Sequence, residues 1–131
     1  MDTLLMITLL VLMSACSSVC LYIWCRHGVG KCISKKNLTG KTVAITGANT
    51  GLGYYTALDL AKRNAKVILI CRNMEKGREA MRTLKEESGN DKIFLKIADL
   101  AILASVRNVA EEINSEESRL DILINNAGVS G

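Results

Sequence analysis

The 131 residues contain no proline, a single histidine and only 4% aromatic residues. A structural zinc site needs four ligands, and the five cysteines show no paired C-x-x-C spacing that would supply them. Their odd number also argues against a disulfide framework. The net charge of +4 is too small to indicate a nucleic-acid partner. We therefore expect neither a metal ion nor a nucleic acid among the partners of this chain.

Charge is also missing from a long stretch near the N-terminus. Residues 3–24, TLLMITLLVLMSACSSVCLYIW, form a run of 22 residues without a charged side chain. As a helix this run would be about 33 Å long, enough to cross the hydrocarbon core of a bilayer. A cleaved signal peptide and a buried helix of a soluble protein are the other interpretations. A signal peptide usually begins with a basic segment, whereas only Met1 and Asp2 precede this run. We predict a membrane anchor over residues 1–25.

The residues that follow the uncharged run predict its orientation. Basic residues favour the cytoplasmic side of a membrane helix, and four of them follow the run: Arg26, Lys31, Lys35 and Lys36. Tyr22 and Trp24 suit the aromatic belt at that interface. We therefore expect a single-pass protein of the endoplasmic reticulum membrane that contacts the lipid bilayer through residues 3–24. Residues 26–40 would be a basic linker to a domain on the cytoplasmic face.

From residue 41 onwards, short apolar runs alternate with helical patterns. The runs TVAIT and KVILIC lack polar alternation, which is typical of strands covered on both faces. In the second helical pattern, Met74, Gly77, Met81 and Leu84 recur at helical spacing and predict its buried face. The predicted strands are 42–46, 66–71, 92–99 and 120–125, and the predicted helices are 52–64, 74–88 and 102–113. This order predicts a parallel sheet with helices on its faces.

A glycine-rich loop joins the first predicted strand to the first predicted helix of this domain. The stretch VAITGANTGLG has the spacing Gly47-x-x-x-Gly51-x-Gly53. Glycines let the backbone turn tightly and approach a pyrophosphate, and the following helix presents unpaired N–H groups. The spacing differs from G-x-G-x-x-G, and Tyr54 stands where a P-loop would need lysine. A phosphate-binding loop and a purely structural turn remain the two interpretations of these glycines.

Three motifs in this domain resemble those of a known family. TGANTGLG at 46–53, ADL at 98–100 and NNAG at 125–128 occur in the order found in short-chain dehydrogenases/reductases. With the anchor and with CRNMEKG at 71–77, the chain looks most like the retinol dehydrogenase branch. The resemblance covers about residues 38–131. It implies that residues 41–131 are the first half of a Rossmann-type doubly wound parallel α/β sheet, with about four strands and three helices.

The resemblance also implies which residues bind a dinucleotide. Thr46 would tie the glycine loop to the fourth strand, and Asp99 would bind the adenine amino group with Leu100 beside it. The residues that would line the pyrophosphate and the adjoining ribose are Gly47, Ala48, Asn49, Thr50, Gly51, Leu52 and Gly53. Those that would pack the fourth strand against the cofactor are Asn125, Ala127 and Gly128. A helix cap is the alternative role for Asp99, and a polar turn is the alternative for the two asparagines at 125–126.

The charge at the end of the second predicted strand distinguishes between the two nicotinamide cofactors. NAD-preferring enzymes place a carboxylate there, to accept from the ribose 2′-OH. Here that place holds Cys71, followed by Arg72, and no acid occurs before Glu75. A guanidinium can pair with a 2′-phosphate. We therefore predict NADP(H) as the cofactor and Arg72 as its clamp, with a solvated Arg72 as the alternative. Many NADP-selective relatives carry a second basic residue in or after the loop, which is absent here.

The catalytic groups that the family uses are not found in this sequence. In the family, a tyrosine followed four residues later by lysine exchanges the proton. Tyr22, Tyr54 and Tyr55 are followed at that distance by Arg26, Leu58 and Asp59. We therefore assign no catalytic residue, and expect the 131 residues alone to be inactive. The fourth strand would then be an exposed apolar edge.

Two functions are compatible with this sequence. The first is the cofactor-binding part of a membrane-anchored NADP(H)-dependent oxidoreductase, with a lipophilic alcohol or carbonyl such as a retinoid as substrate. The second is a truncated, non-catalytic membrane protein that binds nucleotide weakly or competes for the partners of the full-length enzyme. A nucleotide-sugar-modifying relative would have the spacing Thr-Gly-x-x-Gly-x-x-Gly, which differs from the spacing here.

Overall fold

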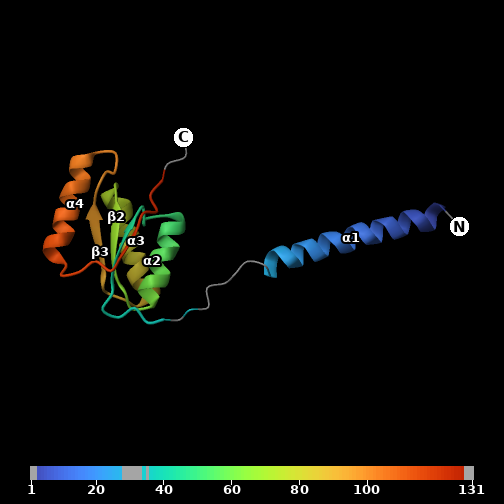
Figure 1. The fold of residues 1–131 in the computed structure, drawn as a ribbon, viewed down its shortest axis with the longest axis horizontal. Helices are drawn as coiled ribbons and strands as arrows, with labels where there is room; N and C mark the ends of the chain where they lie inside the picture. Colours follow the sequence, from blue (N-terminus) through green and yellow to red (C-terminus); the bar gives the residue numbers. More distant parts are fainter. Residues whose placement is uncertain (1–2, 28–33, 35, 129–131) are drawn as a thin grey trace. The chain divides into compact units, whose positions relative to one another are not determined.

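The computed structural model describes residues 3–27, 34 and 36–128. The chain divides into two compact units, one ending at Ser34 and the other beginning at Lys35 (Figure 1). Much of the predicted linker over 26–40, including Lys31 and Lys35, lies outside the described residues.

The described part of the first unit is one helix, α1 (Thr3–His27), of 25 residues, together with Ser34. Its segment Met6–Cys25 has a mean hydropathy of 2.2, and none of it is buried. The hydroxyls of Ser17 and Ser18 both donate to the carbonyl of Ser14 at 2.9 Å, so these polar groups are paired within the helix. The helix is therefore long and apolar enough to cross a membrane, a test that a signal sequence near the N-terminus also passes.

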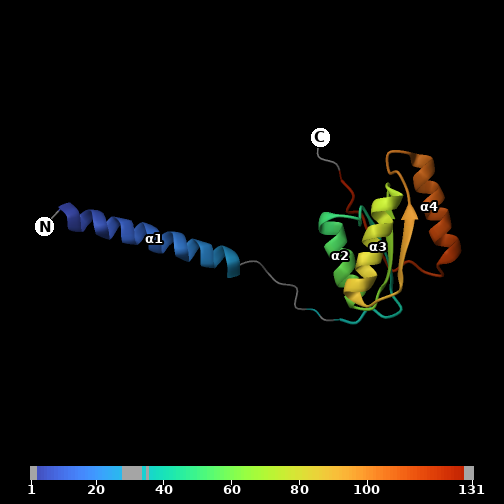
Figure 2. The same cartoon turned by 180° about the vertical axis from the view of Figure 1, so that it is seen from behind.

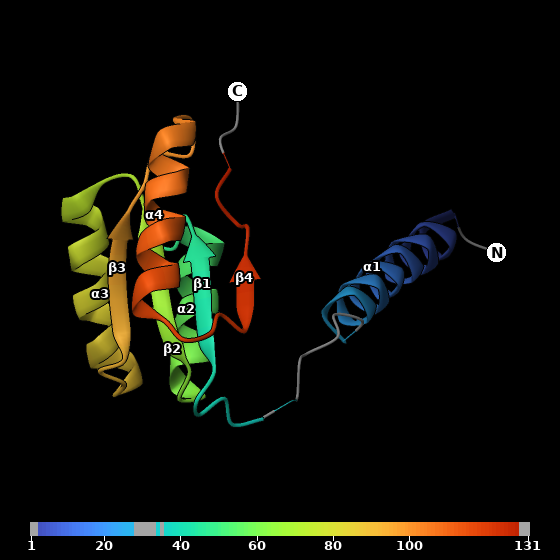
Figure 3. The same cartoon turned by 60° about the vertical axis from the view of Figure 1, so that its left-hand side comes forward.

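The second unit is built on a four-stranded parallel sheet in the order β3-β2-β1-β4. The strands are β1 (Thr42–Thr46), β2 (Lys66–Cys71), β3 (Ile93–Ile97) and β4 (Ile122–Ile124). The helices between them are α2 (Gly51–Lys62), α3 (Met74–Ser88) and α4 (Leu103–Glu116). The chain first adds strands on one side of β1 and then returns to its other side with β4 (Figure 3). All the predicted elements are present, and their ends differ from the prediction by a few residues.

Helices cover both faces of this sheet. α2 and α3 lie side by side on one face, and α4 lies on the other (Figures 1 and 2). Alternate residues of β1 and β2 belong to separate cores: Val43, Ile45, Val67 and Leu69 on the α2–α3 side, and Ala44, Ile68 and Ile70 on the α4 side. Because the central strands are buried on both faces, their sequences are continuously apolar.

Helix α3 begins and ends at the residues that the sequence indicates. The Asn73 side chain accepts from the N–H of Lys76 at 2.9 Å, and Gly89 ends the helix in the left-handed conformation. The predicted buried face was wrong at Met74, which is 47% exposed. Ala80 is buried instead, at 6% exposure. Met74 is the first residue of α3. The helical period predicts which residues share a face, but it does not predict at which turn α3 begins to contact the sheet.

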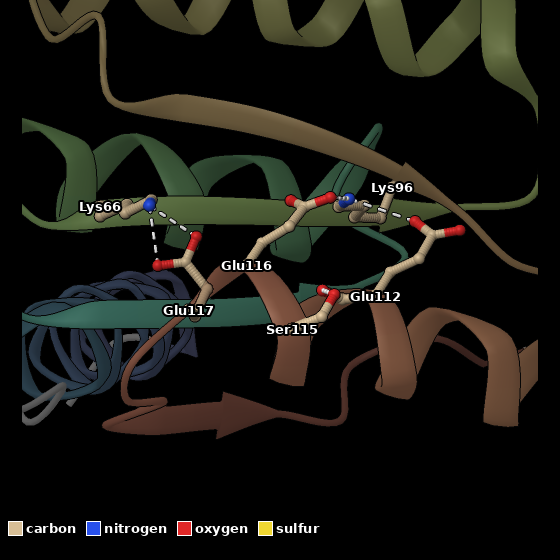
Figure 4. A network of polar contacts seen from close by, with 6 residues as sticks. All are labelled: Lys66, Lys96, Glu112, Ser115, Glu116 and Glu117. Carbon is tan, nitrogen blue, oxygen red and sulfur yellow. Dashed lines mark hydrogen bonds and ion pairs between the residues drawn. The ribbon is translucent and has the colours of Figure 1, made fainter.

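Ion pairs hold the C-terminal half of α4 to the sheet (Figure 4). Lys66 of β2 pairs with Glu117, and Lys96 of β3 pairs with Glu112 at 3.1 Å and with Glu116 at 2.5 Å. The last turn of α4 has no basic residue of its own. Carboxylates are unfavourable at that end of a helix, so the two lysines of the neighbouring strands offset their charge.

Strand β4 lies at the edge of the described sheet and is short. Ile122 is 38% exposed and Leu123 is 54% exposed, so the expected apolar edge is present within the described residues. The Asp121 carboxylate holds the start of this strand. It accepts from the Lys41 ammonium at 2.8 Å, from the Thr42 N–H at 2.9 Å, and pairs with Arg119 at 3.0 Å.

Candidate cofactor site

The candidate site lies at the carboxyl ends of the strands. β2 and β4 lie on opposite sides of β1, and the chain passes over opposite faces of the sheet to reach them. Loops that leave parallel strands at such a point diverge and leave a crevice between them. The glycine loop after β1 is therefore at the position where a doubly wound sheet usually binds its ligand.

Two glycines of this loop are required by close backbone approach. Gly47 has a φ of +64°, and a Cβ on it would lie 2.9 Å from the Cα of Ala127. A Cβ on Gly53 would lie 2.6 Å from the carbonyl oxygen of Gly47. Larger residues at either position would push the loop away from α2 or from the segment after β4. The glycines therefore shape the loop whether or not a ligand is bound.

Thr46 and Asn126 join the loop to the segment after β4. The Thr46 hydroxyl oxygen accepts from the N–H groups of Asn126 and Ala127, each at 3.0 Å. The Asn126 side-chain amide donates to the carbonyls of Thr46 at 3.0 Å and Gly47 at 3.3 Å. The sequence interpretation named Asn125 and missed Asn126, whose amide makes these contacts. The position of Asn126 just after β4 could have indicated this role, because β4 pairs with β1, the strand that precedes the glycine loop.

The first turn of α2 leaves donors free for an anion. Its N-cap residue, Thr50, is extended and makes no side-chain capping bond, and the first turn has no acidic residue. The first N–H groups of a helix have no partner within it, and they carry partial positive charge. An anion placed over the glycine loop would therefore meet both N–H donors and a favourable field.

A cavity of about 430 Å³ opens beside the glycine loop. It is lined by seven of the residues predicted to bind the cofactor: Gly47, Asn49, Arg72, Asp99, Leu100, Ala127 and Gly128. The other predicted residues do not line it. Thr46 and Ala48 are buried, and Thr50 lines a neighbouring cavity. Gly51, Leu52, Gly53 and Asn125 line neither of these two cavities, and Leu52 is 77% exposed.

The groups at the end of β2 carry no negative charge. Burial raises the pKa of the Cys71 thiol, although N–H groups of Ala48 and Asn49 beside it act in the opposite direction. The thiol is therefore neutral near pH 7. Arg72, which follows it, is exposed and lines the cavity. A ligand with an additional phosphate at this position would meet a cation and no carboxylate from β2.

Asp99 follows β3 and also lines this cavity. Its carboxylate accepts from the N–H of Ala101 at 3.0 Å, and its own N–H donates to the Ser105 hydroxyl at 3.0 Å. The N-cap residue of α4 is Ile102, so Asp99 does not cap that helix. Ser105 was missed by the sequence interpretation, because its bond to Asp99 depends on how the loop folds.

Tyr54 lies in the first turn of α2, next to the glycine loop. The Tyr54 hydroxyl donates to Glu87 at 3.2 Å, and desolvation together with Glu87 raises the pKa of this tyrosine. A proton-transfer tyrosine needs a pKa shift in the other direction. Within residues 3–27, 34 and 36–128, no three His, Cys, Asp or Glu side chains gather into a possible metal site. The arrangement therefore presents backbone N–H donors and the guanidinium of Arg72 to an anionic ligand.

Comparison with known proteins shows which family has this arrangement. Residues 41–131 match the family described as short chain dehydrogenase. The chain is 52% identical over 99 residues to human dehydrogenase/reductase SDR family member 13, covering 76% of this chain and 26% of that protein. It is 51% identical over 100 residues to human retinol dehydrogenase 13, covering 76% and 30%. The chain thus spans less than a third of the length of these two relatives.

A solved structure shows the same likeness in three dimensions. L-sorbose reductase from Gluconobacter frateurii, complexed with NADPH and L-sorbose, matches with a TM-score of 0.68 and 34% identity. The match covers 75% of this chain and 37% of that one. These comparisons confirm both the predicted family and the predicted fold class.

Proposed function

Because this chain belongs to the short-chain dehydrogenase family, we propose that it is the cofactor-binding part of a membrane-anchored, NADP(H)-dependent oxidoreductase. When bound, this cofactor supplies or accepts a hydride. The observation that carries the proposal is the position of Arg72, which lines one cavity with the glycine loop while β2 ends in a neutral thiol. The related L-sorbose reductase was solved with NADPH, which supports the same cofactor here.

Different residues of the cavity would hold different parts of the cofactor. Gly47, Asn49 and the free N–H groups of α2 would hold the pyrophosphate. Asp99 and Leu100 would hold the adenine, and Arg72 would pair with the ribose 2′-phosphate. Ala127 and Gly128 would close the cavity from the β4 side.

The substrate proposal rests on α1 and on the relatives. A helix that anchors the domain to a bilayer would keep its site close to molecules dissolved in lipid. One relative is named retinol dehydrogenase 13, which is consistent with a retinoid or another lipophilic alcohol or carbonyl. We place α1 in the endoplasmic reticulum membrane as a single span, with the sheet on the cytoplasmic face. The 131 residues contain no Tyr-x-x-x-Lys, so we propose that they bind cofactor without turning substrate over.

The test of the cofactor proposal is the substitution Arg72→Ala. We expect affinity for NADPH to fall about tenfold or more, because a charge-assisted contact with the 2′-phosphate is lost. Affinity for NADH should change by less than about twofold, since NADH has no such phosphate. Isothermal titration calorimetry of the full chain in detergent micelles would measure both affinities.

Arg107→Ala is the matched control, because Arg107 is an exposed arginine of α4 that does not line the cavity. It should leave both affinities unchanged. An equal loss of NADPH and NADH binding in Arg72→Ala would contradict the assignment of Arg72 to the 2′-phosphate.

A further inference from the structure

The segments that lead into the four parallel strands lie at the other end of the sheet from the candidate cofactor site, at the bottom of the sheet in Figure 3. The N–H of Lys66 donates to the carbonyl of Lys41 at 2.8 Å, and the N–H of Val67 donates to the carbonyl of Lys92 at 2.9 Å. The Lys41 ammonium also contacts the Asp121 carboxylate at 2.8 Å, just before β4. These four segments therefore meet in space, and we call them together the amino-end surface: residues 36–41, 63–66, 89–92 and 117–121.

The amino-end surface concentrates the positive charge of the α/β unit. It contains three acidic residues and six basic residues: Asp91, Glu117 and Asp121, and Lys36, Lys41, Arg63, Lys66, Lys92 and Arg119. The other described residues of this unit include eight basic and nine acidic residues. The excess of basic residues is therefore found at the end of the sheet where the strands begin.

Two of the three carboxylates of this surface are covered, whereas the cations that pair with them are exposed. The Asp121 side chain is 10% exposed and the Glu117 side chain is 12% exposed. The side chains of Lys41, Lys66 and Arg119, which pair with them, are 46%, 32% and 62% exposed. A molecule that approaches this surface would therefore meet ammonium and guanidinium groups before it met these two carboxylates.

The remaining charges add to this imbalance. Lys36 and Lys92 are exposed, and so is Lys62, the last residue of α2, which borders the surface. Arg63 pairs with a carboxylate of α2, so its charge is offset. Asp91 is the exposed acidic residue among the described residues of this surface. The exposed side chains thus suit a partner that carries many negative charges over a broad area.

We propose that the amino-end surface binds the anionic phospholipid headgroups of the bilayer that α1 spans. The proposal rests on the membrane anchoring proposed above and names a second contact with the same membrane. The chain that follows α1 leads into this surface before it forms β1, so the tether and the charges would act at the same end of the sheet. Anionic headgroups attract clusters of lysine and arginine over about 10 Å at 0.1 M salt. The cofactor cavity, at the other end of the strands, would then open toward the cytoplasm, where dinucleotides are dissolved.

The test measures how fast an amine-reactive ester labels individual lysines, with peptide mass spectrometry as the readout. The full 131-residue chain is placed in lipid nanodiscs of phosphatidylcholine alone or with about 30% phosphatidylglycerol, an anionic lipid without an amine. We expect Lys41, Lys62 and Lys92 to be labelled about threefold more slowly in the anionic discs. Lys76, an exposed lysine of α3 outside the surface, should be labelled equally in both. About 0.5 M salt should remove the difference, because it screens exposed charges.

Two charge-reversal variants test whether this surface causes the effect. Lys62→Glu combined with Lys92→Glu leaves the surface and its border without a net charge, so Lys41 should be labelled equally in both kinds of disc. Arg78→Glu combined with Arg107→Glu is the matched control, because it changes the net charge by the same amount at exposed residues outside the surface. This control should keep the slower labelling of Lys41 in anionic discs. Circular dichroism of each variant would verify that the fold is retained.

The outcomes separate this proposal from the proposed function. If the surface lysines are labelled at the same rate in both kinds of disc, or if Lys76 is slowed as much as they are, the surface does not bind the bilayer and anchoring by α1 stands. The same conclusion follows if Lys62→Glu with Lys92→Glu behaves like the wild type. If heparin slows the labelling in phosphatidylcholine discs and the anionic lipid does not, the partner is an acidic polymer and the proposal is wrong. If the chain does not enter the discs, both the anchoring and this proposal are overturned.

Discussion

At the scale of single residues, two glycines of the loop share a positive φ for different reasons. Gly47 and Gly51 both have a positive φ, +64° and +59°. A Cβ on Gly51 would meet nothing within 4 Å, whereas one on Gly47 would lie 2.9 Å from the Cα of Ala127. Gly51 is therefore selected by backbone conformation alone, and Gly47 by conformation together with the approach of the segment after β4.

This difference predicts unequal effects of two alanine substitutions. Gly51→Ala should lower the free energy of unfolding by about 1 kcal/mol, the cost of a left-handed L-residue. Gly47→Ala should cost about 2–4 kcal/mol, because the new methyl group must also displace Ala127 or the loop. Urea unfolding of the full chain, with the change in midpoint measured for each variant, would test this. Equal losses for the two variants would show that the loop and the segment after β4 are not in close contact.

At the scale of elements, the two outermost described strands are held differently. β3 joins the sheet along its whole length, with five residue pairs from Val67↔Ile93 to Cys71↔Ile97. β4 is aligned with β1 through three pairs, Val43↔Ile122 to Ile45↔Ile124, and its apolar residues are partly exposed. Its position relies on polar contacts at its two ends, Asp121 before the strand and Asn126 after it.

The contacts of Asp121 predict how stability depends on pH. Hydrogen bonds from Lys41 and Thr42 lower the pKa of this carboxyl from 3.8 to about 2. A carboxyl with a lowered pKa stabilises the fold fully above its unfolded pKa, and this contribution is lost as the pH falls through the folded pKa. Wild-type stability should therefore decrease between about pH 4 and pH 2. Asp121→Asn should be less stable at neutral pH and should lack this decrease.

Urea unfolding between pH 2 and pH 7 would measure both curves. Asp59→Asn is the control, because the Asp59 side chain is 57% exposed and pairs with Arg63, the C-cap residue of α2, and ion pairs of exposed carboxylates contribute little. Its curve should follow that of the wild type. If the stability curves of the wild type and of Asp121→Asn stay parallel down to pH 2, protonation of Asp121 does not cause the loss of stability.

At the scale of the whole molecule, the chain combines an apolar helix with a separate α/β unit. If α1 is retained as a span and the sheet is cytoplasmic, the sheet never enters the lumen of the endoplasmic reticulum. N-linked glycosylation occurs only in that lumen and needs the sequence Asn-x-Ser/Thr. One acceptor is present at 37–39, and Ala110→Thr would create a second at the exposed Asn108.

We expect neither acceptor to be glycosylated when the chain is translated with microsomes, and the full mass of 14.3 kDa to be retained. Residues 36–131 placed behind a cleavable signal peptide form the control, in which the added acceptor should be modified. Efficient modification of the intact chain would reverse the proposed orientation. A loss of mass corresponding to the first 16–25 residues would identify α1 as a signal peptide.

Much of the fold could be predicted from local patterns. The alternation of apolar strands with helical periods predicted a parallel sheet, and the limits of β1 and β2 were predicted to the residue. Cap residues such as Asn73 and Gly89 predicted the ends of α3. These features could be inferred because strand, helix and cap preferences act between residues a few positions apart. The glycine spacing similarly predicted where a phosphate-binding loop would lie.

The tertiary structure decided which distant residues meet. The order β3-β2-β1-β4 brings Asn126 to Thr46, 80 positions earlier in the chain. It also places Lys76 and Asn49 around one cavity, and leaves Met74 exposed on the same helix as the buried Leu84. Such contacts depend on how whole elements pack on the sheet, and no local pattern encodes that packing. The sequence by itself determined the elements and the loop, whereas packing determined which side chains surround the candidate cofactor site.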